Sequence, residues 1–195
     1  MKKLKRSAFA RKTISALMVL VMAIGSLSLI ACTRVTDEEA TEIVSDLTLR
    51  SYNLNVAYYG KGLPCDEELS VGGGYYTVAE DATFRIRNDL IVETRAVFSE
   101  NVANSLISVY LDGVVSLGVS QYARYITGPD GFLTAKMDYD YVVEEITQYD
   151  VSTIEIIKNK KNEIIAEITS VDGAQTIEVV LVYEPEGWRI DSPTY

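Results

Sequence analysis

The chain has 195 residues and a formal net charge of −10, and its charged residues are distributed very unevenly. Residues 1–31 hold six of the 18 basic residues and no acidic one, so residues 32–195 carry the other 12 basic residues and all 28 acidic ones. The resulting net charge of −16 disfavours nucleic-acid binding, because phosphate backbones repel such a surface. The chain has no histidine, which excludes Ser-His-Asp and Cys-His catalysis and His-ligated zinc.

The N-terminus shows the three zones of a secretory signal. A basic zone ends at Lys12, an apolar run extends over residues 14–31, and a cysteine follows at position 32. The residues Leu29, Ile30, Ala31 and Cys32 resemble a bacterial lipobox, in which the cysteine sulfur receives a diacylglycerol and the peptidase cuts just before it. We therefore predict a signal peptide over 1–31, a lipidated Cys32 with a tether over 32–36, and a single domain over 37–195.

An uncleaved membrane anchor is the alternative, since a run of about 18 apolar residues can just span a bilayer. Both interpretations place residues 33–195 on the extracytoplasmic side of the cell membrane, held there by lipid or by the anchor. With Cys32 acylated, Cys65 is the only remaining cysteine, so no intramolecular disulfide is expected. The acids that follow Cys65 would raise the pKa of its thiol, which argues against a catalytic role.

The first half of the domain reads as mainly helical. Thr36 and Glu39 form a capping-box pattern, and apolar residues then recur at three- and four-residue steps as far as Tyr58. This pattern predicts an amphipathic helix of about 22 residues that is ended by Gly60 and Gly62. A loop is predicted over 60–75, in which three consecutive glycines act as a flexible connector. Two shorter helices are predicted next, one opening near Asn88 or Asp89 and one capped by Ser99.

Beyond residue 113 the apolar period changes to two, which indicates strands. Gly128–Gly131 is a turn signal between predicted strands at 119–127 and 132–137. Strands at 151–158, 163–171, 176–184 and 188–191 then form an antiparallel meander. Helices followed by strands predict an α+β domain, with the N-terminal helices packed on a curved antiparallel sheet of about four to six strands.

This order of elements resembles the nuclear-transport-factor-2-like or cystatin-like roll. The closing segment, Gly187–Tyr195, is similar to the last strand of bacterial lipoproteins with such a domain. The pattern of Tyr76, Val78, Phe84, Asp89-Leu90 and Val97-Phe98-Ser99 is similar to the secreted DL-endopeptidase inhibitor family of bacilli. Where that family has an aspartate two residues after the valine, this chain has Glu80-Asp81. The resemblance implies fold more than activity.

Residues 138–150 contain five acids and three tyrosines, and Asp138 and Asp140 would share one face of a strand. Carboxylates arranged in this way are candidate Ca²⁺ ligands. The alternative is a solvated acidic edge that discourages strand pairing, because the glycine and the final glutamate of an EF-hand loop are missing. We expect no bound cofactor and single out no catalytic residue.

Three functions stay open at this point. The first is a non-catalytic protein-interaction module, which could restrain a cationic cell-wall hydrolase, because an acidic surface attracts basic proteins. The second is a small-ligand receptor that uses an internal pocket of the roll. The third is an isomerase- or dehydratase-type enzyme, which would need a buried aspartate beside a tyrosine. A homodimer through the outer sheet face is also permitted by the apolar residues Ile157, Ile165, Val180 and Val182.

Overall fold

The computed structural model describes residues 34–116, 119–139 and 145–195, and the folded unit runs from Thr36 to Tyr195. It begins with helix α2 (Asp37–Tyr58), whose 22 residues match the predicted length. The capping box is confirmed: the Thr36 hydroxyl accepts from the Glu39 amide at 3.1 Å, and the Glu39 carboxylate accepts from the Thr36 amide at 2.8 Å. Acidic residues at 37–39 also favour the positive end of the helix dipole.

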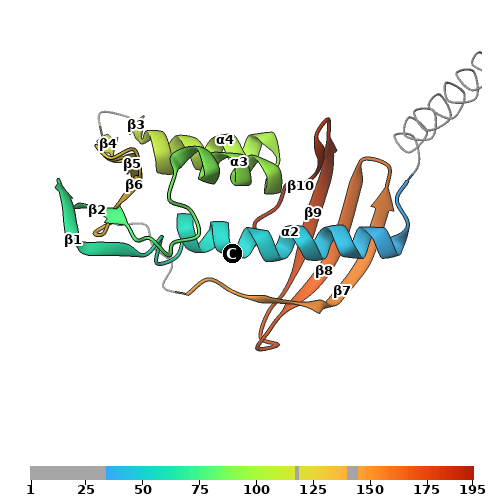
Figure 1. Cartoon of the computed structure of the whole chain (residues 1–195). Coiled ribbons are helices and arrows are strands. Elements are labelled where there is room, and N and C mark those ends of the chain that lie inside the picture. The colour runs from blue at the N-terminus through green and yellow to red at the C-terminus, as the bar shows by residue number, and fades with distance from the viewer. Residues whose placement is uncertain (1–33, 117–118, 140–144) are drawn as a thin grey trace, which may run out of the picture. The chain divides into compact units, whose positions relative to one another are not determined.

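The predicted meander is confirmed as a four-stranded antiparallel sheet, here called sheet B, in the order β10-β9-β8-β7. Its strands are β7 (Tyr149–Lys160), β8 (Glu163–Ser170), β9 (Thr176–Glu184) and β10 (Gly187–Ile190). One face of this sheet packs under α2 (Figure 1). The residues with no exposed area on this inner face are Ile164, Ala166, Ile168, Val179, Leu181 and Ile190. Buried and exposed residues alternate along β8, as the period of two predicts for a strand with one face in the core.

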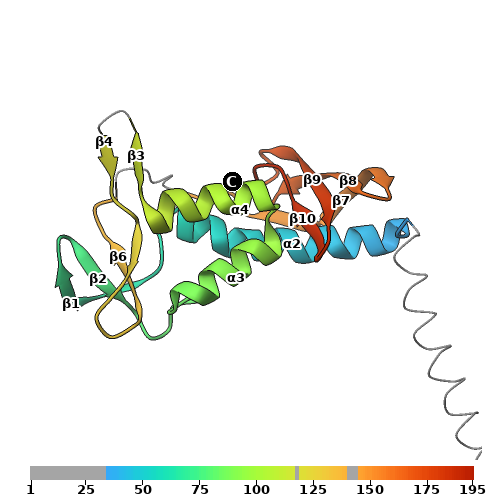
Figure 2. The ribbon, with the colours of Figure 1, turned by 90° about the horizontal axis from the view of Figure 1, so that it is seen from above.

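Two shorter helices, α3 (Arg87–Val97) and α4 (Glu100–Ile107), follow each other with a sharp corner between them (Figure 2). Ser99 caps α4 as predicted, since its hydroxyl accepts from the Val102 amide. A single π-helical turn, Ser108–Asp112, then continues α4. The corner also contacts the edge of sheet B, because the Ser99 amide donates to the Ile190 carbonyl at 2.9 Å.

A second antiparallel sheet, sheet A, has the order β1-β2-β6-β5. Its strands are β1 (Cys65–Gly72), β2 (Tyr75–Val78), β5 (Tyr125–Thr127) and β6 (Leu133–Lys136). The hairpin of β3 (Val114–Ser116) and β4 (Val119–Gln121) forms separately. The predicted turn over 128–131 joins β5 to β6, and the Gly128 amide donates to the Phe132 carbonyl at 2.7 Å.

The predicted loop over 60–75 is wrong, because residues 65–72 form a strand. This strand lies at an edge and six of its eight residues are exposed, so its sequence lacks the apolar alternation of a half-buried strand. Gly72, Gly73 and Gly74 all have positive φ and make the tight β1–β2 turn, which only glycine adopts readily. The α+β class and a helix packed on an open antiparallel sheet are confirmed. Strands β5 and β6 of sheet A lie within the predicted strands at 119–127 and 132–137, whereas β1, β2 and the separate second sheet were not predicted.

Candidate functional site

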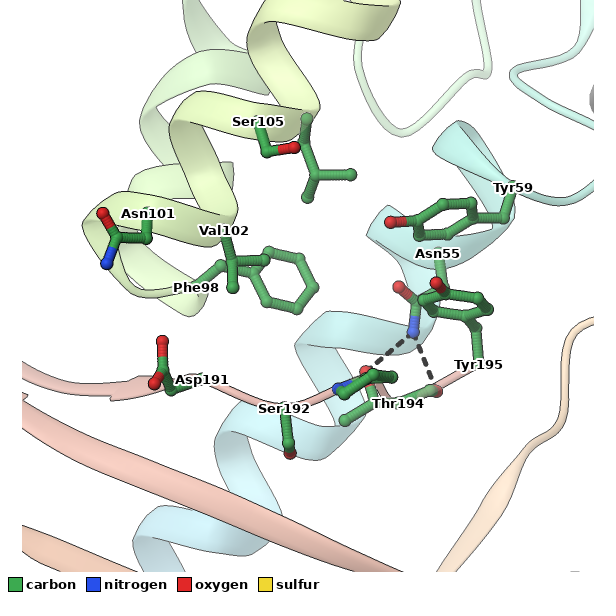
Figure 3. Close-up of a pocket in the computed structure, with 12 residues that line it drawn as sticks. Asn55, Tyr59, Phe98, Asn101, Val102, Ser105, Asp191, Ser192, Thr194 and Tyr195 are labelled. Atoms are coloured by element: carbon green, nitrogen blue, oxygen red, sulfur yellow. Dashed lines mark hydrogen bonds between the residues drawn. The ribbon is translucent and has the colours of Figure 1, made fainter.

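A cavity of about 320 Å³ lies between the C-terminal half of α2, helix α4 and the segment that follows β10 (Figure 3). Its apolar lining comes from Tyr59, Phe98, Val102, Leu106, Pro193 and Tyr195. Its polar lining comes from Asn55, Asn101, Ser105, Asp191, Ser192 and Thr194. A volume of this size is at the lower end of the range for small-molecule sites, which are typically about 300–1,000 Å³.

Asn55 holds one wall of the cavity in place. Its side-chain nitrogen donates both to the carbonyl and to the hydroxyl of Thr194, each at 2.9 Å. The Thr194 hydroxyl in turn donates to the Ser51 hydroxyl at 3.2 Å. All three residues are almost fully buried. This network fixes the last residues of the chain against α2, because leaving any of these groups unpaired in the interior would be costly.

The opposite wall comes from the corner between α3 and α4. Phe98 and Leu106 are nearly buried, and Val102 lies between them on the cavity side. The Ser99 hydroxyl donates to the Asp191 carboxylate. This bond ties the corner to the end of β10 and holds a carboxylate at the cavity mouth. Asp191 itself remains exposed.

Two tyrosines, Tyr59 and Tyr195, line the cavity near the end of α2, and Tyr110 packs against Tyr59. The rings of Tyr59 and Tyr195 stack with centroids 3.9 Å apart, and the Tyr110 ring meets Tyr59 edge-on at 5.6 Å. Burial raises the pKa of Tyr59 above its ordinary value and raises that of Tyr110 to about 12. Both phenols are therefore neutral near pH 7, and their hydroxyls can donate or accept a hydrogen bond.

A buried arginine fixes the end of α2. The Arg124 guanidinium, 3% exposed, donates to the carbonyls of Tyr58 and Gly60, each at 2.7 Å. The last turn of α2 contains no basic residue of its own. Arg124 therefore supplies the positive charge that the carbonyl end of a helix favours, and it positions Tyr59 indirectly.

Among the candidate site residues from the sequence, Asp138 lies in a turn after β6, so its predicted place on a strand face is wrong. Its carboxylate is exposed and pairs with the Lys136 ammonium at 2.9 Å, a contact that lowers its pKa. Its candidate partner Asp140 lies outside the described residues, as do Leu29, Ile30, Ala31 and Cys32 of the lipobox. Within the described residues no three carboxylates or thiols gather in a way that could hold a metal ion.

Cys65 is half-buried, and its Sγ lies 3.5 Å from the Leu63 carbonyl. The pKa of its thiol is raised, as predicted, but the main cause is burial rather than the neighbouring acids. A raised pKa reduces the thiolate fraction and with it the nucleophilicity at neutral pH.

The outer face of sheet B carries a row of three glutamates. The strand register places Glu167 directly opposite both Glu155 and Glu178, and all three are exposed. Beside this glutamate row, Ile165 faces Val180 across β8 and β9, and both are half-exposed. Val182 lies one row further along the same face.

Asn55, which lines the cavity, was missed because it lies where an amphipathic pattern expects an apolar side chain. Thr48, Ser51 and Asn55 occupy the same stripe of α2 as the buried Val44 and Leu54. Buried polar residues need partners, so polar residues in an apolar stripe were the available signal.

Comparison with known proteins yields no family model that matches the chain and no curated protein that matches it. In the part of the chain that the structure describes, no helix has both the length and the hydropathy of a membrane-spanning segment.

Proposed function

We propose that the protein is a lipid-anchored, extracytoplasmic binding protein without catalytic activity, whose outer sheet face binds a cationic cell-wall protein. The observation that carries the proposal is the contrast between the two faces of sheet B. The inner face is filled by aliphatic side chains with no exposed area, whereas the outer face presents the glutamate row beside Ile165 and Val180. Apolar residues flanked by charge are typical of protein-binding surfaces.

The glutamate row supports a cationic partner. Like charges directly opposite each other on adjacent strands destabilise a sheet. Lysine or arginine side chains of a partner would relieve this repulsion, and the strongly acidic domain would steer such a partner toward it. A homodimer that laid this face on itself with its strands in the same register would bring two glutamate rows together, which disfavours that arrangement.

The test compares two triple variants of the full-length protein, captured from detergent-solubilised cells of its own host. Glu155, Glu167 and Glu178 are changed to Gln in one variant, and the exposed Glu67, Glu68 and Glu80 in the control. We expect the wild type and the control to retain a basic wall hydrolase at moderate salt and the first variant to lose it. Capture of no wall enzyme, or equal capture by both variants, would overturn the proposal.

The anchor is tested separately. Cys32→Ala should abolish metabolic labelling by a lipid analogue, because it removes the sulfur that receives the lipid. The basic zone, the apolar run and the residues Leu29-Ile30-Ala31-Cys32 motivate this expectation. A Cys32→Ala variant that still takes up the label would contradict it.

A second function, small-ligand binding, is favoured by the cavity at the end of α2. A ligand that binds only the folded state raises the unfolding midpoint as its concentration increases. The enzyme alternative has less support, because every described Asp and Glu is at least partly exposed, and Asp191 is the only carboxylate residue that lines this cavity.

A further inference from the structure

A second, much smaller cavity of about 30 Å³ lies between α2, the start of β7 and the C-terminal segment. Thr48 and Ser51 line it from α2, Tyr149 lines it from β7, and Thr194 lines it from the C-terminal segment. A cavity of this volume accommodates a water molecule. It is too small for an aromatic ring, since an engineered cavity that takes up benzene has about 150 Å³.

Two buried hydroxyls at this cavity lack a hydrogen-bond partner. Thr48 is 4% exposed and Tyr149 is 5% exposed, and no described residue forms a hydrogen bond with the side-chain hydroxyl of either. A hydroxyl that is buried without a hydrogen bond destabilises the folded state, so the large majority of such groups in native proteins have a partner. Two of them at one cavity indicate a single bound group that serves both.

The neighbouring hydroxyls already use their protons in a chain of hydrogen bonds. The Ser51 hydroxyl donates to the Thr48 carbonyl at 2.9 Å and accepts from the Thr194 hydroxyl at 3.2 Å. The Thr194 hydroxyl in turn accepts from the Asn55 side chain at 2.9 Å (Figure 3). This chain ends at the carbonyl of Thr48 and leaves the Thr48 hydroxyl unpaired.

The chemistry of the lining favours a neutral group that both donates and accepts. None of the described residues that line the cavity carries a charge, whereas protein sites for hard cations use several oxygen ligands, carboxylates among them. Burial raises the pKa of Tyr149, an effect that the Thr147 side chain partly opposes, so the phenol keeps its proton at pH 7. Each of the two unpaired hydroxyls can therefore donate or accept a hydrogen bond.

We propose that this cavity binds one buried water molecule, which bridges the Thr48 hydroxyl of α2 and the Tyr149 hydroxyl of β7. Water has the size of the cavity and both hydrogen-bonding capacities that the two hydroxyls require. Thr194 lines this cavity and also the cavity of about 320 Å³, so the water lies beside the wall that the two cavities share. The site stands or falls independently of the protein-binding surface on sheet B.

The experiment compares urea unfolding of the full-length protein in a non-ionic detergent for the wild type, Thr48→Val, Tyr149→Phe and the double variant. Each substitution removes a hydroxyl and nearly keeps the shape of the side chain. We expect each single variant to lower the folding equilibrium constant about three- to tenfold, because the other hydroxyl loses its bridged partner. The double variant should lose less than the product of the two factors, since no buried hydroxyl is then left unpaired.

Two control variants remove the same groups at more exposed positions. Thr41→Val lies on the partly exposed part of α2, and Tyr122→Phe changes a tyrosine that is 69% exposed. Both should change the folding equilibrium constant by less than about twofold. If the controls lost as much as Thr48→Val and Tyr149→Phe, the losses would not report on the cavity and the proposal would be overturned.

The sign of the effect separates a bridged pair of hydroxyls from an empty cavity. With no bound water both hydroxyls would be unpaired in the wild type, so removing either would raise the folding equilibrium constant. A gain in either single variant would therefore overturn the proposal. Losses that simply multiply in the double variant would show that the two hydroxyls have separate partners, which would overturn the shared water.

A crystal structure of the full-length protein locates the bound group directly. We expect one ordered water within about 2.5–3.0 Å of both hydroxyl oxygens in the wild type and none at this position in the double variant. No density between the two hydroxyls would overturn the proposal. Density surrounded by six or more oxygens at about 2.3–2.6 Å would identify a cation instead of water.

Discussion

The two four-stranded sheets contact α2 in different ways. Sheet B packs an aliphatic face against the helix, with Ile164, Ile168 and Leu181 carrying no exposed area. Sheet A approaches the other end through polar groups: the Tyr125 hydroxyl donates to the Ala57 carbonyl at 2.6 Å, and Arg124 donates to two further carbonyls. One contact depends on shape and apolar area, whereas the other depends on hydrogen bonds to the open carbonyl end of the helix.

This difference has a consequence for function. The aliphatic side chains on the inner face of sheet B have no exposed area, whereas the roll pocket considered from the sequence would have needed accessible space there. The polar end of α2 is less completely filled, and the cavity lies there between Tyr59 and α4. A few hydrogen bonds can fix the residues that form one wall of a cavity without filling the volume of the cavity.

The largest effect on stability is expected from truncating an aliphatic side chain in the contact between sheet B and α2. Leu181→Ala should lower the free energy of unfolding by about 3–5 kcal/mol, because it removes a fully buried side chain from a central strand. Urea unfolding followed by circular dichroism measures the change. Val182→Ala, on the half-exposed outer face, is the matched control and should cost less than about 1.5 kcal/mol. Equal losses would contradict the assignment of the two faces.

The second largest effect is expected when the hydrogen bonds from Arg124 to the end of α2 are removed. Arg124→Met should cost about 3 kcal/mol, because it leaves the carbonyls of Tyr58 and Gly60 without their donor in a buried place. Arg124→Lys should restore only part of this loss, since one ammonium does not reproduce the planar fork that reaches both carbonyls.

Arg50→Met provides a control for loss of an arginine as such. Arg50 pairs with Glu93 and Asp46 on a partly exposed surface, at 2.7 and 3.1 Å. Such pairs contribute about 1 kcal/mol or less. Urea unfolding tests this comparison. If Arg50→Met lowered the free energy of unfolding as much as Arg124→Met does, the special role of the buried arginine would be refuted.

At high pH, the hydrogen-bonded contact between sheet A and the end of α2 should be the first part of the protein to lose stability. Burial raises the pKa of Tyr125 to about 12, so above pH 10 the unfolded chain loses this proton while the folded chain keeps it. The stabilisation is complete below pH 10 and is lost as the pH rises through about 12. Tyr125→Phe should therefore reduce the downward slope of stability between pH 10 and 12 by up to about 1.4 kcal/mol per pH unit.

The same substitution has a cost at neutral pH. Tyr125→Phe removes the donor to Ala57 and the acceptor for the Leu63 amide, and should destabilise the protein by about 1–2 kcal/mol at pH 7. Tyr122 is 69% exposed, so Tyr122→Phe should change neither stability nor slope. Parallel pH–stability curves for the wild type and Tyr125→Phe would count against a raised pKa at Tyr125.

The contact between sheet B and α2 was predictable from the sequence, whereas the hydrogen bonds between sheet A and the end of α2 were not. Period-two alternation located β8 and β9 to within a residue, and the capping box located the start of α2, because both signals lie within one element. The bonds of Arg124 and Tyr125 join residues more than 60 positions apart. No local pattern specifies such a partner.

The cavity was not predictable for the same reason, because its residues are far apart in the sequence. Asn55 and Thr194 are 139 residues apart, and only the folded chain brings them together. The sequence did contain half of the signal, since Thr48, Ser51 and Asn55 are polar residues in an apolar stripe. Strand β1 was missed for a different reason: an exposed edge strand with adjacent acids has the composition of a loop.

The smallest effect concerns the outer face of sheet B. Glu167→Lys converts two repulsive cross-strand pairs, with Glu155 and Glu178, into attractive ones and should stabilise the protein by about 0.5–1 kcal/mol. Thermal unfolding measures the gain, and Glu186→Lys, at an exposed turn position, should give none. A gain in stability that coincided with loss of the cationic partner would mean that the glutamate row is retained for binding at the expense of the fold. A loss of stability would instead show that the three carboxylates do not repel one another as the strand register requires.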